Sequence, residues 1–417
     1  MEFLPSWPPA FTTQMAAGLL LLAGVLGGFV AHHFKWLPSV TGFMLVGLAI
    51  GPSGLGLITA DALGLARAVV DVSLGLILYR LGLSLDLRAM RTDWSLFYTA
   101  ALESVATFGA VFLVLSALDV PPLIAALVSA IVVSSSPAVL LHVAHEVGAE
   151  GPVTQRSEQL VAFNNMLSFF AFSALLPAGH LAREEDWDVA VLQPLYQFLG
   201  SVLLGIVVGV LLYRLSRLVR RAPQYRLALI IGALLLGLGL ADALELSPLF
   251  VPLVIGVVVS SLEKGEQISG VEFGEAFELL FIVLFVYAGA KLDPGGIGAV
   301  LPLALALAVA RIAMKVFAVY LGSRWHGLSP RASVASGLLL VPMAGLAIGL
   351  AQTADSLFAL QAAQLNALVL TAVAIFETIG PPIAAWAFHL AGETAEDRAE
   401  ALRTAQSAGG ETNSGGT

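Results

Sequence analysis

Apolar runs close to twenty residues long repeat along the whole chain and restrict it to one class of protein. A helix needs about 20 apolar residues to cross a bilayer. Charged residues are only 12% of the 417 positions, whereas soluble domains carry about 25%. We therefore predict an all-α polytopic membrane protein with thirteen transmembrane helices. The thirteen runs lie at 15–33, 38–58, 64–83, 95–117, 121–145, 156–178, 190–213, 226–245, 247–262, 274–290, 298–322, 331–353 and 361–390.

The basic residues indicate how these helices are oriented. With the N-terminus outside, fourteen Lys and Arg residues fall in the inner loops and three in the outer loops. Inner loops of membrane proteins are enriched in Lys and Arg, so we expect the C-terminus in the cytoplasm. Residues 1–390 are the expected transmembrane domain. Residues 391–417 are the expected cytosolic tail, charged at first and largely disordered, because its Gly, Ser and Thr residues cannot bury enough apolar surface.

Short matches at a common offset indicate an internal repeat. The sequence GLSLD at 82–86 returns as GAKLD at 289–293, and LPSVTGFMLVG at 37–47 resembles SPLFVPLVIG at 247–256. Pro137 and Pro342 are likewise matched in the two halves. The matched segments are separated by seven spans, an odd number, so the two halves must be inverted in the membrane. Inverted repeats with interrupted segments at corresponding positions are typical of secondary transporters.

Two of the predicted helices carry helix-breaking residues near their middle. Proline lacks a backbone N–H and clashes with the preceding turn, and nearby serines can satisfy the groups that are freed. Two kinked helices would explain the pattern. Two unwound helices that cross and present backbone N–H and C=O groups to an ion would also explain it. The residues concerned are Ser134, Ser135, Ser136 and Pro137 in the first helix, and Pro342 and Gly345 in the second.

Six ionisable residues stand out within the predicted spans because they lie deep in them. Each costs at least about 2.5–3.5 kcal/mol at a helix centre and is by default a functional candidate. Structural ion pairs would also account for them, and Arg80 could extend its side chain to the membrane surface. Arg311 and Lys315 share one helix face and need a carboxylate or an anion nearby. The six candidates for proton coupling, ion binding or ion pairing are Asp71, Arg80, Glu103, Arg311, Lys315 and Glu377.

Two adjacent amides, Asn164 and Asn165, interrupt the apolar run QLVAFNNMLSFF at 159–170. Buried amides need hydrogen-bond partners or a function. Neither a nucleophile with a base nor a phosphate-binding loop is visible in the sequence, so we expect no enzyme. We also expect no cofactor, no metal site and no nucleic-acid partner. The run HVAHE at 142–146 is interpreted as a solvated helix end.

Taken in order, the motifs resemble the monovalent cation/proton antiporters of the Kef and NapA kind. The resemblance covers nearly all of residues 15–390. It is carried by LPSVTGFMLVGLAIGPSGLG, LGLILYRLGLSLDL, SSSPAVLLHVAHEVG, LSPLFVPLVIGVVVSS, FELLFIVLFVYAGAKLDP, ARIAMKVFAVYLGSRWHGLSPRASVASGLLLVPMAGLAIGLA and FETIGPP.

This resemblance implies the thirteen-helix NhaA/NapA-like fold with two broken, crossed helices. It also implies a homodimer in the inner (plasma) membrane of a bacterium. Helices 1–3 and 8–10 would form the dimer part, and helices 4–6 and 11–13 the moving core.

The expected ion site departs from the family's pattern. In the family, the helix after the first broken one usually carries two adjacent polar residues. The second is a carboxylate that binds the cation and competes for protons. Here the pair is Asn164–Asn165, and asparagine cannot titrate. The family's basic residue falls on Lys315, and Arg80 stands where some relatives have a glutamate. The acidic residue often found in the second broken helix is missing from Met343-Ala344-Gly345.

Three functions stay open at this point. The leading one is a sodium or potassium/proton antiporter with non-standard coupling, in which Glu103 or Lys315 carries the proton. The second keeps the fold and transports an anion at Asn164, Asn165, Lys315 and Arg80. The third is a homologue that no longer transports and acts as a sensor.

Overall fold

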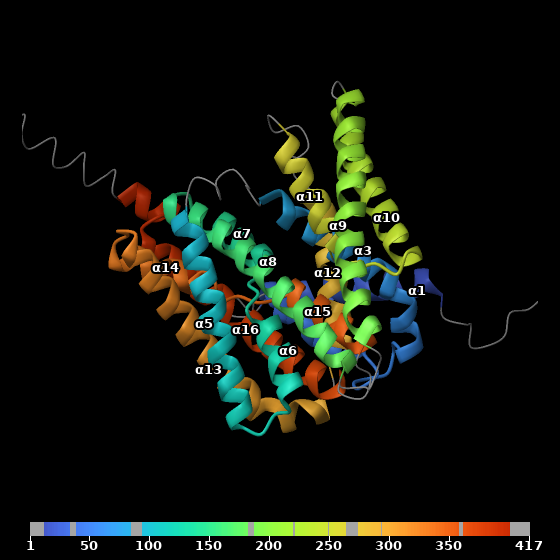
Figure 1. Ribbon diagram of the computed structural model, residues 1–417, viewed down its shortest axis with the longest axis horizontal. Coiled ribbons are helices and arrows are strands. Elements are labelled where there is room, and N and C mark those ends of the chain that lie inside the picture. The colour runs from blue at the N-terminus through green and yellow to red at the C-terminus, as the bar shows by residue number, and fades with distance from the viewer. Residues whose placement is uncertain are drawn as a thin grey trace, which may run out of the picture.

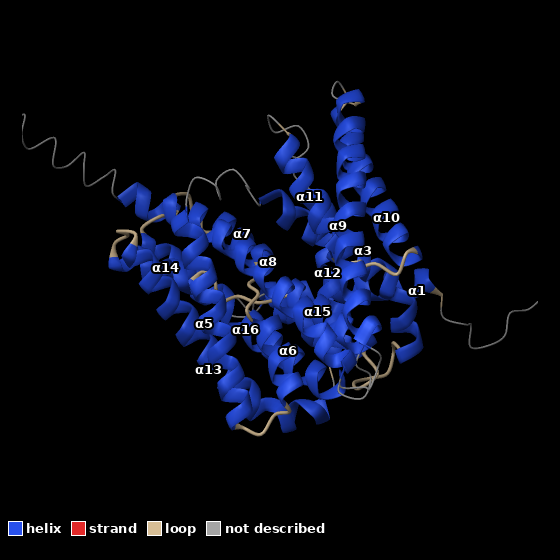
Figure 2. Ribbon diagram, in the orientation of Figure 1, coloured by secondary structure: helices blue, strands red, loops and turns tan. Residues whose placement is uncertain are grey.

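The computed structural model describes residues 12–33, 39–84, 94–181, 187–219, 222–248, 250–263, 274–292, 294–357 and 362–400. Over these ranges every regular element is a helix (Figures 1 and 2). The helices are α1 (Thr13–His33), α2 (Ser39–Ile50), α3 (Ala60–Ser84), α5 (Trp94–Ala117), α6 (Pro122–Val132), α7 (Pro137–Glu146), α8 (Pro152–Leu181), α9 (Trp187–Leu218), the 3-10 turn η1 (Pro223–Tyr225), α10 (Arg226–Ala243), α11 (Phe250–Leu262), α12 (Gly274–Ala290), α13 (Pro294–Trp325), α14 (Pro330–Leu338), α15 (Gly345–Leu357) and α16 (Ala362–Ala391).

Each predicted apolar run coincides with a helix or with a pair of half-helices. The helix in the run at 38–58 is shorter than predicted: α2 ends at Ile50 and is followed by Gly51-Pro52. A proline disfavours helical geometry at the residue before it. Within the described residues, eight helices are long and apolar enough to cross a membrane, and the helices over Phe250–Leu262 and Leu279–Ala290 are shorter and apolar. The all-helical fold is confirmed, and the count of thirteen crossings stays a prediction.

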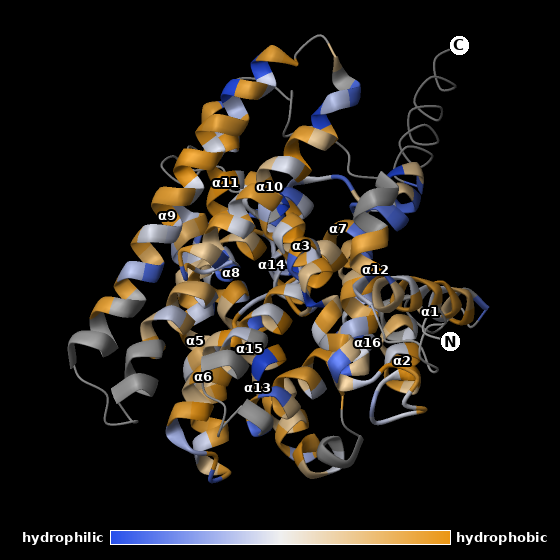
Figure 3. Cartoon of the chain, turned by 90° about the vertical axis from the view of Figure 1, so that its right-hand side faces the viewer, coloured by the Kyte–Doolittle hydropathy of each residue, from blue (hydrophilic) through white to orange (hydrophobic). Residues whose placement is uncertain are grey.

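The helices pack in two groups (Figure 1). In one group α13 lies along α5, α14 and α16, with α6, α7 and α8 beside them. In the other, α11 lies along α3 and α9, and α12 along α2 and α1. Apolar side chains such as Phe29 on α1 and Leu203 on α9 remain exposed, and hydrophobic colour predominates on both helices in Figure 3. These surfaces suit contact with lipid.

Glycines at matched positions of the repeat make matched helix contacts. Gly47 of α2 packs on the carbonyl of Val286 in α12, and Gly256 of α11 packs on the carbonyl of Tyr79 in α3. A Cβ at either glycine would overlap that carbonyl, so only glycine permits the close approach. Small residues are the usual means by which membrane helices approach closely. The paired contacts support the predicted repeat, because both members of each contact are shifted by nearly the same offset.

The expected tail is partly ordered. Residues 395–400 are helical, and Glu393 and Thr394 are buried. Thr394 and Asp397 start this helix with a reciprocal capping arrangement, in which the Asp397 N–H donates to Thr394 Oγ1 (3.2 Å) and the Thr394 N–H donates to Asp397 Oδ2 (3.3 Å). The Thr394 hydroxyl donates to the same carboxylate oxygen (2.6 Å). The Thr394 hydroxyl also holds the pKa of Asp397 below its usual range. Residues 401–417, where we expected disorder, lie outside the described residues.

Candidate functional site

The two interrupted helices cross at their interruptions. We call residues 133–136, between α6 and α7, the first break, and residues 339–344, between α14 and α15, the second break. The Ser135 hydroxyl of the first break donates to the Leu340 carbonyl of the second (2.6 Å). The Ser136 N–H donates to the Pro342 carbonyl (2.8 Å). The prediction of two broken, crossed helices is therefore confirmed.

Local sequence explains why the helices stop and restart here. Ser136 caps α7, its side chain accepting a hydrogen bond from the Val139 N–H, and Pro137 occupies the first helical position. A proline is favoured at that position because its missing N–H would have no intrahelical partner anyway. In the second break Pro342 lacks a donor, and α15 begins at Gly345. The breaks are thus specified by residues that favour a helix start.

Arg311 of α13 holds the two breaks together. Its guanidinium donates to the carbonyls of Val132 (2.6 Å), Val341 (2.5 Å), Ser134 (2.7 Å) and Leu340 (3.4 Å). These carbonyls lie at the C-terminal end of α6 and in the breaks just after α6 and α14, where the helix dipoles concentrate negative charge. The side chain is fully buried and stacks over Phe376 of α16, with Cζ 4.3 Å from the ring centroid. Arg311 therefore neutralises helix ends, and the carboxylate partner that we considered for it is not needed.

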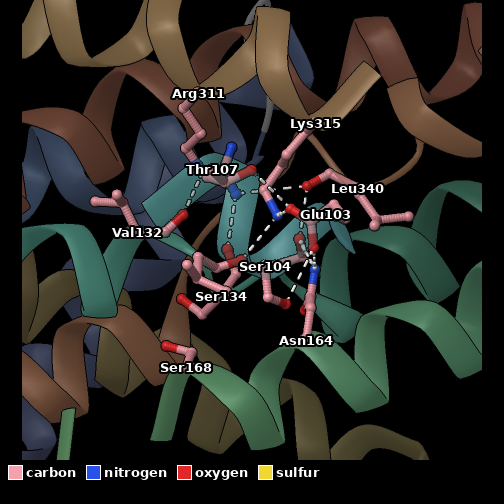
Figure 4. A network of polar contacts seen from close by, with 12 residues as sticks. Glu103, Ser104, Thr107, Val132, Ser134, Asn164, Ser168, Arg311, Lys315 and Leu340 are labelled. Atoms are coloured by element: carbon pink, nitrogen blue, oxygen red, sulfur yellow. Dashed lines mark hydrogen bonds and ion pairs between the residues drawn. The ribbon is translucent and has the colours of Figure 1, made fainter. Parts of the chain in front are cut away.

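Lys315 forms the ion pair that the sequence left open (Figure 4). Its Nζ lies 2.6 Å from Glu103 Oε1, and both side chains are 0% exposed. Nζ also donates to the Val133 carbonyl of the first break (2.7 Å). On α5, Thr107 donates to Glu103 Oε1 (3.0 Å) and Ser104 to Oε2 (3.4 Å). The carboxylate is thus held at the crossing by a lysine and by two hydroxyls of its own helix.

The two adjacent asparagines have different surroundings. Asn165 is paired twice with one residue: its Oδ1 accepts from the Ser135 N–H (2.8 Å) and its Nδ2 donates to the Ser135 carbonyl (2.8 Å). Asn164 Nδ2 donates to Ser135 Oγ (3.0 Å) and Glu103 Oε2 (3.5 Å). Asn164 Oδ1 is buried and has no hydrogen-bond partner. Asn165 therefore supports the unwound backbone, whereas Asn164 offers a free acceptor beside a carboxylate.

Three of the predicted residues lie elsewhere. Asp71 pairs with Arg67 on its own helix (4.0 Å). Arg80 lies close enough to Glu158, nearly two turns before Asn164 on α8, to interact with it electrostatically. Glu377 follows Phe376 on α16 and is 0% exposed, with neither carboxylate oxygen hydrogen-bonded. The crossing therefore takes its negative charge from Glu103.

Sequence reasoning missed two hydroxyl residues that bond the crossing and one aromatic residue that stacks on Arg311. Thr107 escaped notice because hydroxyl residues are common in membrane helices, although its place one turn after Glu103 is a usable signal. Ser168 donates to the Ala130 carbonyl near the end of α6 (2.6 Å) and follows the asparagine pair by one turn. Phe376 carries no polar atom, so nothing in the sequence linked it to an arginine.

Comparison with known proteins places the geometry in a family. Residues 18–388 match the family described as sodium/hydrogen exchanger, transmembrane. The chain belongs to the sodium/hydrogen exchanger family. Its membership makes the protein a multi-pass membrane antiporter of cations and protons, and the family is one of transporters, not of enzymes.

Sequence relatives of this exchanger are distant. It is 24% identical over 369 residues to the ammonium/H(+) antiporter subunit AmhT of Alkalihalophilus pseudofirmus, covering 85% of this chain and 91% of the relative. It is 26% identical over 397 residues to the iron transporter MagA of Paramagnetospirillum magneticum, covering 90% and 85%.

The fold is that of a solved antiporter. The sodium proton antiporter MjNhaP1 of Methanocaldococcus jannaschii superposes with a TM-score of 0.71 and 21% identity, covering 91% of this chain and 98% of the other. This likeness confirms the antiporter fold that the motifs predicted for the exchanger.

Proposed function

We propose that the protein exchanges a monovalent cation for a proton at the Glu103–Lys315 pair. The observation that carries the proposal is the 2.6 Å contact between Lys315 Nζ and Glu103 Oε1, next to the unpaired Oδ1 of Asn164. Glu103 supplies the anionic ligand that the asparagine pair on α8 lacks. Lys315 carries the exchangeable proton.

The coupling follows from competition for one carboxylate. A cation that enters between Glu103 and Asn164 finds oxygen ligands in the carboxylate and in the Oδ1 atom. Two positive charges next to one buried carboxylate repel each other strongly in a low-dielectric site. Binding of the cation therefore favours release of the Lys315 proton. One monovalent cation replaces one proton, so the net charge of the site is unchanged.

The same charge balance opposes anion transport. Lys315 is paired with Glu103, and Arg311 is occupied by four backbone carbonyls. Neither cation is available to an anion at the crossing. Arg80 interacts electrostatically with Glu158, which offsets the positive charge that an anion site would need.

The cation, the assembly and the orientation belong to the same proposal. A relative is an ammonium/H(+) antiporter subunit and a structural neighbour a sodium proton antiporter, so Na⁺, K⁺ and NH₄⁺ are the cations to test. The proposed protein is a homodimer in a bacterial plasma membrane, with its N-terminus outside. The helices α1–α3 and α10–α12 form the dimer part, and α5–α8 and α13–α16 the moving core.

Proteoliposomes with an internal pH dye test the exchange. We expect the unmutated protein to move protons when Na⁺, K⁺ or NH₄⁺ is added as a gluconate salt, and Lys315→Arg to abolish this response. Arginine preserves the ion pair but does not release its proton. Lys291→Arg is the matched control, because Lys291 lies at the end of α12 and contacts Tyr287. Exchange by Lys315→Arg at the unmutated rate would refute the assigned proton carrier, and a response to chloride alone would favour an anion transporter.

A further inference from the structure

The segment that follows α16 is fastened to the loop between α7 and α8. We call residues 393–398 the strap. Glu393 of the strap is 6% exposed, although it carries a carboxylate. Its Oε1 accepts from the Val153 N–H (2.7 Å), and its Oε2 accepts from the Thr154 N–H (2.8 Å) and the Thr154 hydroxyl (2.7 Å). A residue some 240 positions away in the chain thus caps the first turn of α8.

The first N–H groups of any helix lack intrahelical partners. A negative charge placed there is stabilised by the helix dipole, and hydrogen bonds to a charged group are about twice as strong as neutral ones. The cap of α8 does not come from the residues that precede Pro152. It comes from the end of α16, so the two helices are joined at this point.

Further bonds hold the strap along the loop. The Glu150 N–H donates to the Glu393 carbonyl (3.0 Å), and the Ala395 N–H donates to the Val147 carbonyl (3.1 Å). Arg398 donates to Glu150 Oε2 (2.6 Å) and to the Gly148 carbonyl (2.7 Å). The main-chain bonds at Glu393 and at Ala395 show that the strap lies in one register against the loop.

The strap joins α7, α8 and α16, and of these α8 carries Asn164, the proposed oxygen ligand beside Glu103. The strap covers the loop between α7 and α8. Helix α7 begins directly after the first break, and α8 carries Asn164 and Asn165. The strap itself continues from α16, which places Phe376 over Arg311. We propose that Glu393 is a positioning residue for the cation site, fixing α8 in the register that keeps Asn164 beside Glu103. This inference depends on the proposed exchange at that site.

Helix α8 connects the Glu393 cap at its first turn to the two asparagines. Asn165 follows Val153 by twelve residues, so the cap lies about 18 Å along α8 from the asparagines. A helix transmits a shift of its end along its axis, and the hydrogen bonds of Asn164 and Asn165 at 2.8–3.0 Å fail after a shift of well under one residue. Loss of the cap therefore alters cation binding without touching a ligand.

Glu393→Gln tests the role with little change in shape, because glutamine keeps one acceptor oxygen and loses the charge. We expect the cation concentration for half-maximal exchange to rise about tenfold, the equivalent of one lost charged hydrogen bond, with the maximal rate less affected. Glu396→Gln is the matched control, since Glu396 is an exposed glutamate of the same strap. An unchanged half-saturating concentration in Glu393→Gln would overturn the inference.

A reversible crosslink separates positioning from mere stabilisation. The chain contains no cysteine, and a Cβ at Gly148 would lie 2.9 Å from the Ala395 Cβ, so a small outward shift reaches the range of about 3.5–4.5 Å found in disulfides. Gly148 has a φ of +59°, which strains any side chain, so the oxidised crosslink is compared with the reduced form of the same double-cysteine variant. In the Glu393→Gln background, Gly148→Cys with Ala395→Cys should regain the unmutated half-saturating concentration when oxidised and lose it on reduction. A crosslink that raises the melting temperature but leaves half-saturation high would assign Glu393 to stability alone.

Hydrogen exchange gives a readout that does not need transport. Amide exchange over 159–166 should be faster in Glu393→Gln, unchanged in Glu396→Gln, and slowed again by the oxidised crosslink. If the unmutated protein shows no cation-driven proton movement, the proposed exchange fails. If the hydrogen exchange of amides 159–166 is the same in Glu393→Gln as in the unmutated protein, the positioning role fails, whatever the outcome for transport.

Discussion

The two breaks occupy matched places in the repeat, yet they contribute different chemistry to the crossing. The first break consists of Val133 and three serines; Asn165 bonds the backbone of Ser135, and Lys315 donates to the Val133 carbonyl. The second break reads Leu-Leu-Val-Pro-Met-Ala and contributes backbone carbonyls, which accept from Arg311, Ser135 and the Ser136 N–H.

This difference shows how a symmetric backbone acquires an asymmetric site. Both breaks expose helix-end carbonyls, and Arg311 satisfies carbonyls from each. Only the first break brings hydroxyl groups and faces the asparagine pair. Substitutions that affect both breaks should therefore be most damaging, those in the first break should alter cation binding, and those confined to the second should affect stability alone.

Arg311→Lys should have the largest effect, because it loosens both breaks at once. A lysine has three donors at a single point and cannot reach four carbonyls spread over two helices. Each buried carbonyl left without a partner costs about 1–3 kcal/mol, so we expect a loss of about 3 kcal/mol or more and no measurable exchange. Thermal unfolding in detergent measures the first quantity. Arg324→Lys is the control, since Arg324 donates to the exposed Leu328 carbonyl, and equal melting temperatures for both variants would show that the breaks do not depend on the guanidinium.

The same substitution at the two asparagines should give different results. In Asn165→Asp the carboxylate faces the Ser135 carbonyl that Nδ2 now contacts, so we expect a loss of about 1–3 kcal/mol of stability. In Asn164→Asp the new carboxylate lies beside Glu103, and the two together should bind a proton or a cation more tightly. We expect a smaller loss of stability and a half-saturating cation concentration lower by about tenfold. Melting temperatures and exchange assays on the two variants decide between these roles, and identical behaviour would remove the distinction between Asn164 and Asn165.

Much of this arrangement could be predicted from the sequence. The helices, the repeat and both breaks follow from apolar periodicity and from the placement of Pro137 and Pro342. The pairing of Lys315 with a carboxylate also follows, because a buried ammonium needs one. The choice between Glu103 and Glu377 could not be made, since it depends on which helix faces α13 at that depth.

Other features depend on tertiary contacts that no local pattern reports. Arg311 looked like a member of an ion pair, but its partners are backbone carbonyls, which every sequence contains. Arg80 and Asp71 drew attention as buried charges, although each lies near a charge of opposite sign away from the crossing. The strap could not be foreseen, because Glu393 sits in a charged stretch that has the composition of a solvated tail.

Ser135→Ala should remove the side-chain bond between the two breaks and leave the two bonds from Asn165 to the Ser135 backbone in place. The hydroxyl donates to the Leu340 carbonyl and accepts from Asn164, whereas the bonds to Asn165 use the Ser135 backbone. We expect a loss of about 1–2 kcal/mol of stability and a higher half-saturating cation concentration, because Asn164 is no longer fixed. Ser134→Ala is the control, since its hydroxyl donates to the Ile131 carbonyl of α6, the helix that it directly follows. A larger effect at Ser134 than at Ser135 would contradict the assigned contacts.

Gly380→Ala should affect the second break alone and have the smallest effect. A Cβ at Gly380 would lie 3.0 Å from the Pro342 Cα, tighter than ordinary van der Waals contact, so α16 must shift by a few tenths of an ångström. Overpacking of this kind costs about 1 kcal/mol. Gly239→Ala in α10, where nothing lies within 4 Å of the new Cβ, should be neutral or slightly stabilising. Because the second break offers only backbone carbonyls held by other residues, half-saturation in Gly380→Ala should match the unmutated protein while its melting temperature falls. A changed half-saturating concentration would mean that the second break takes part in binding the cation, and the asymmetry between the breaks would be lost.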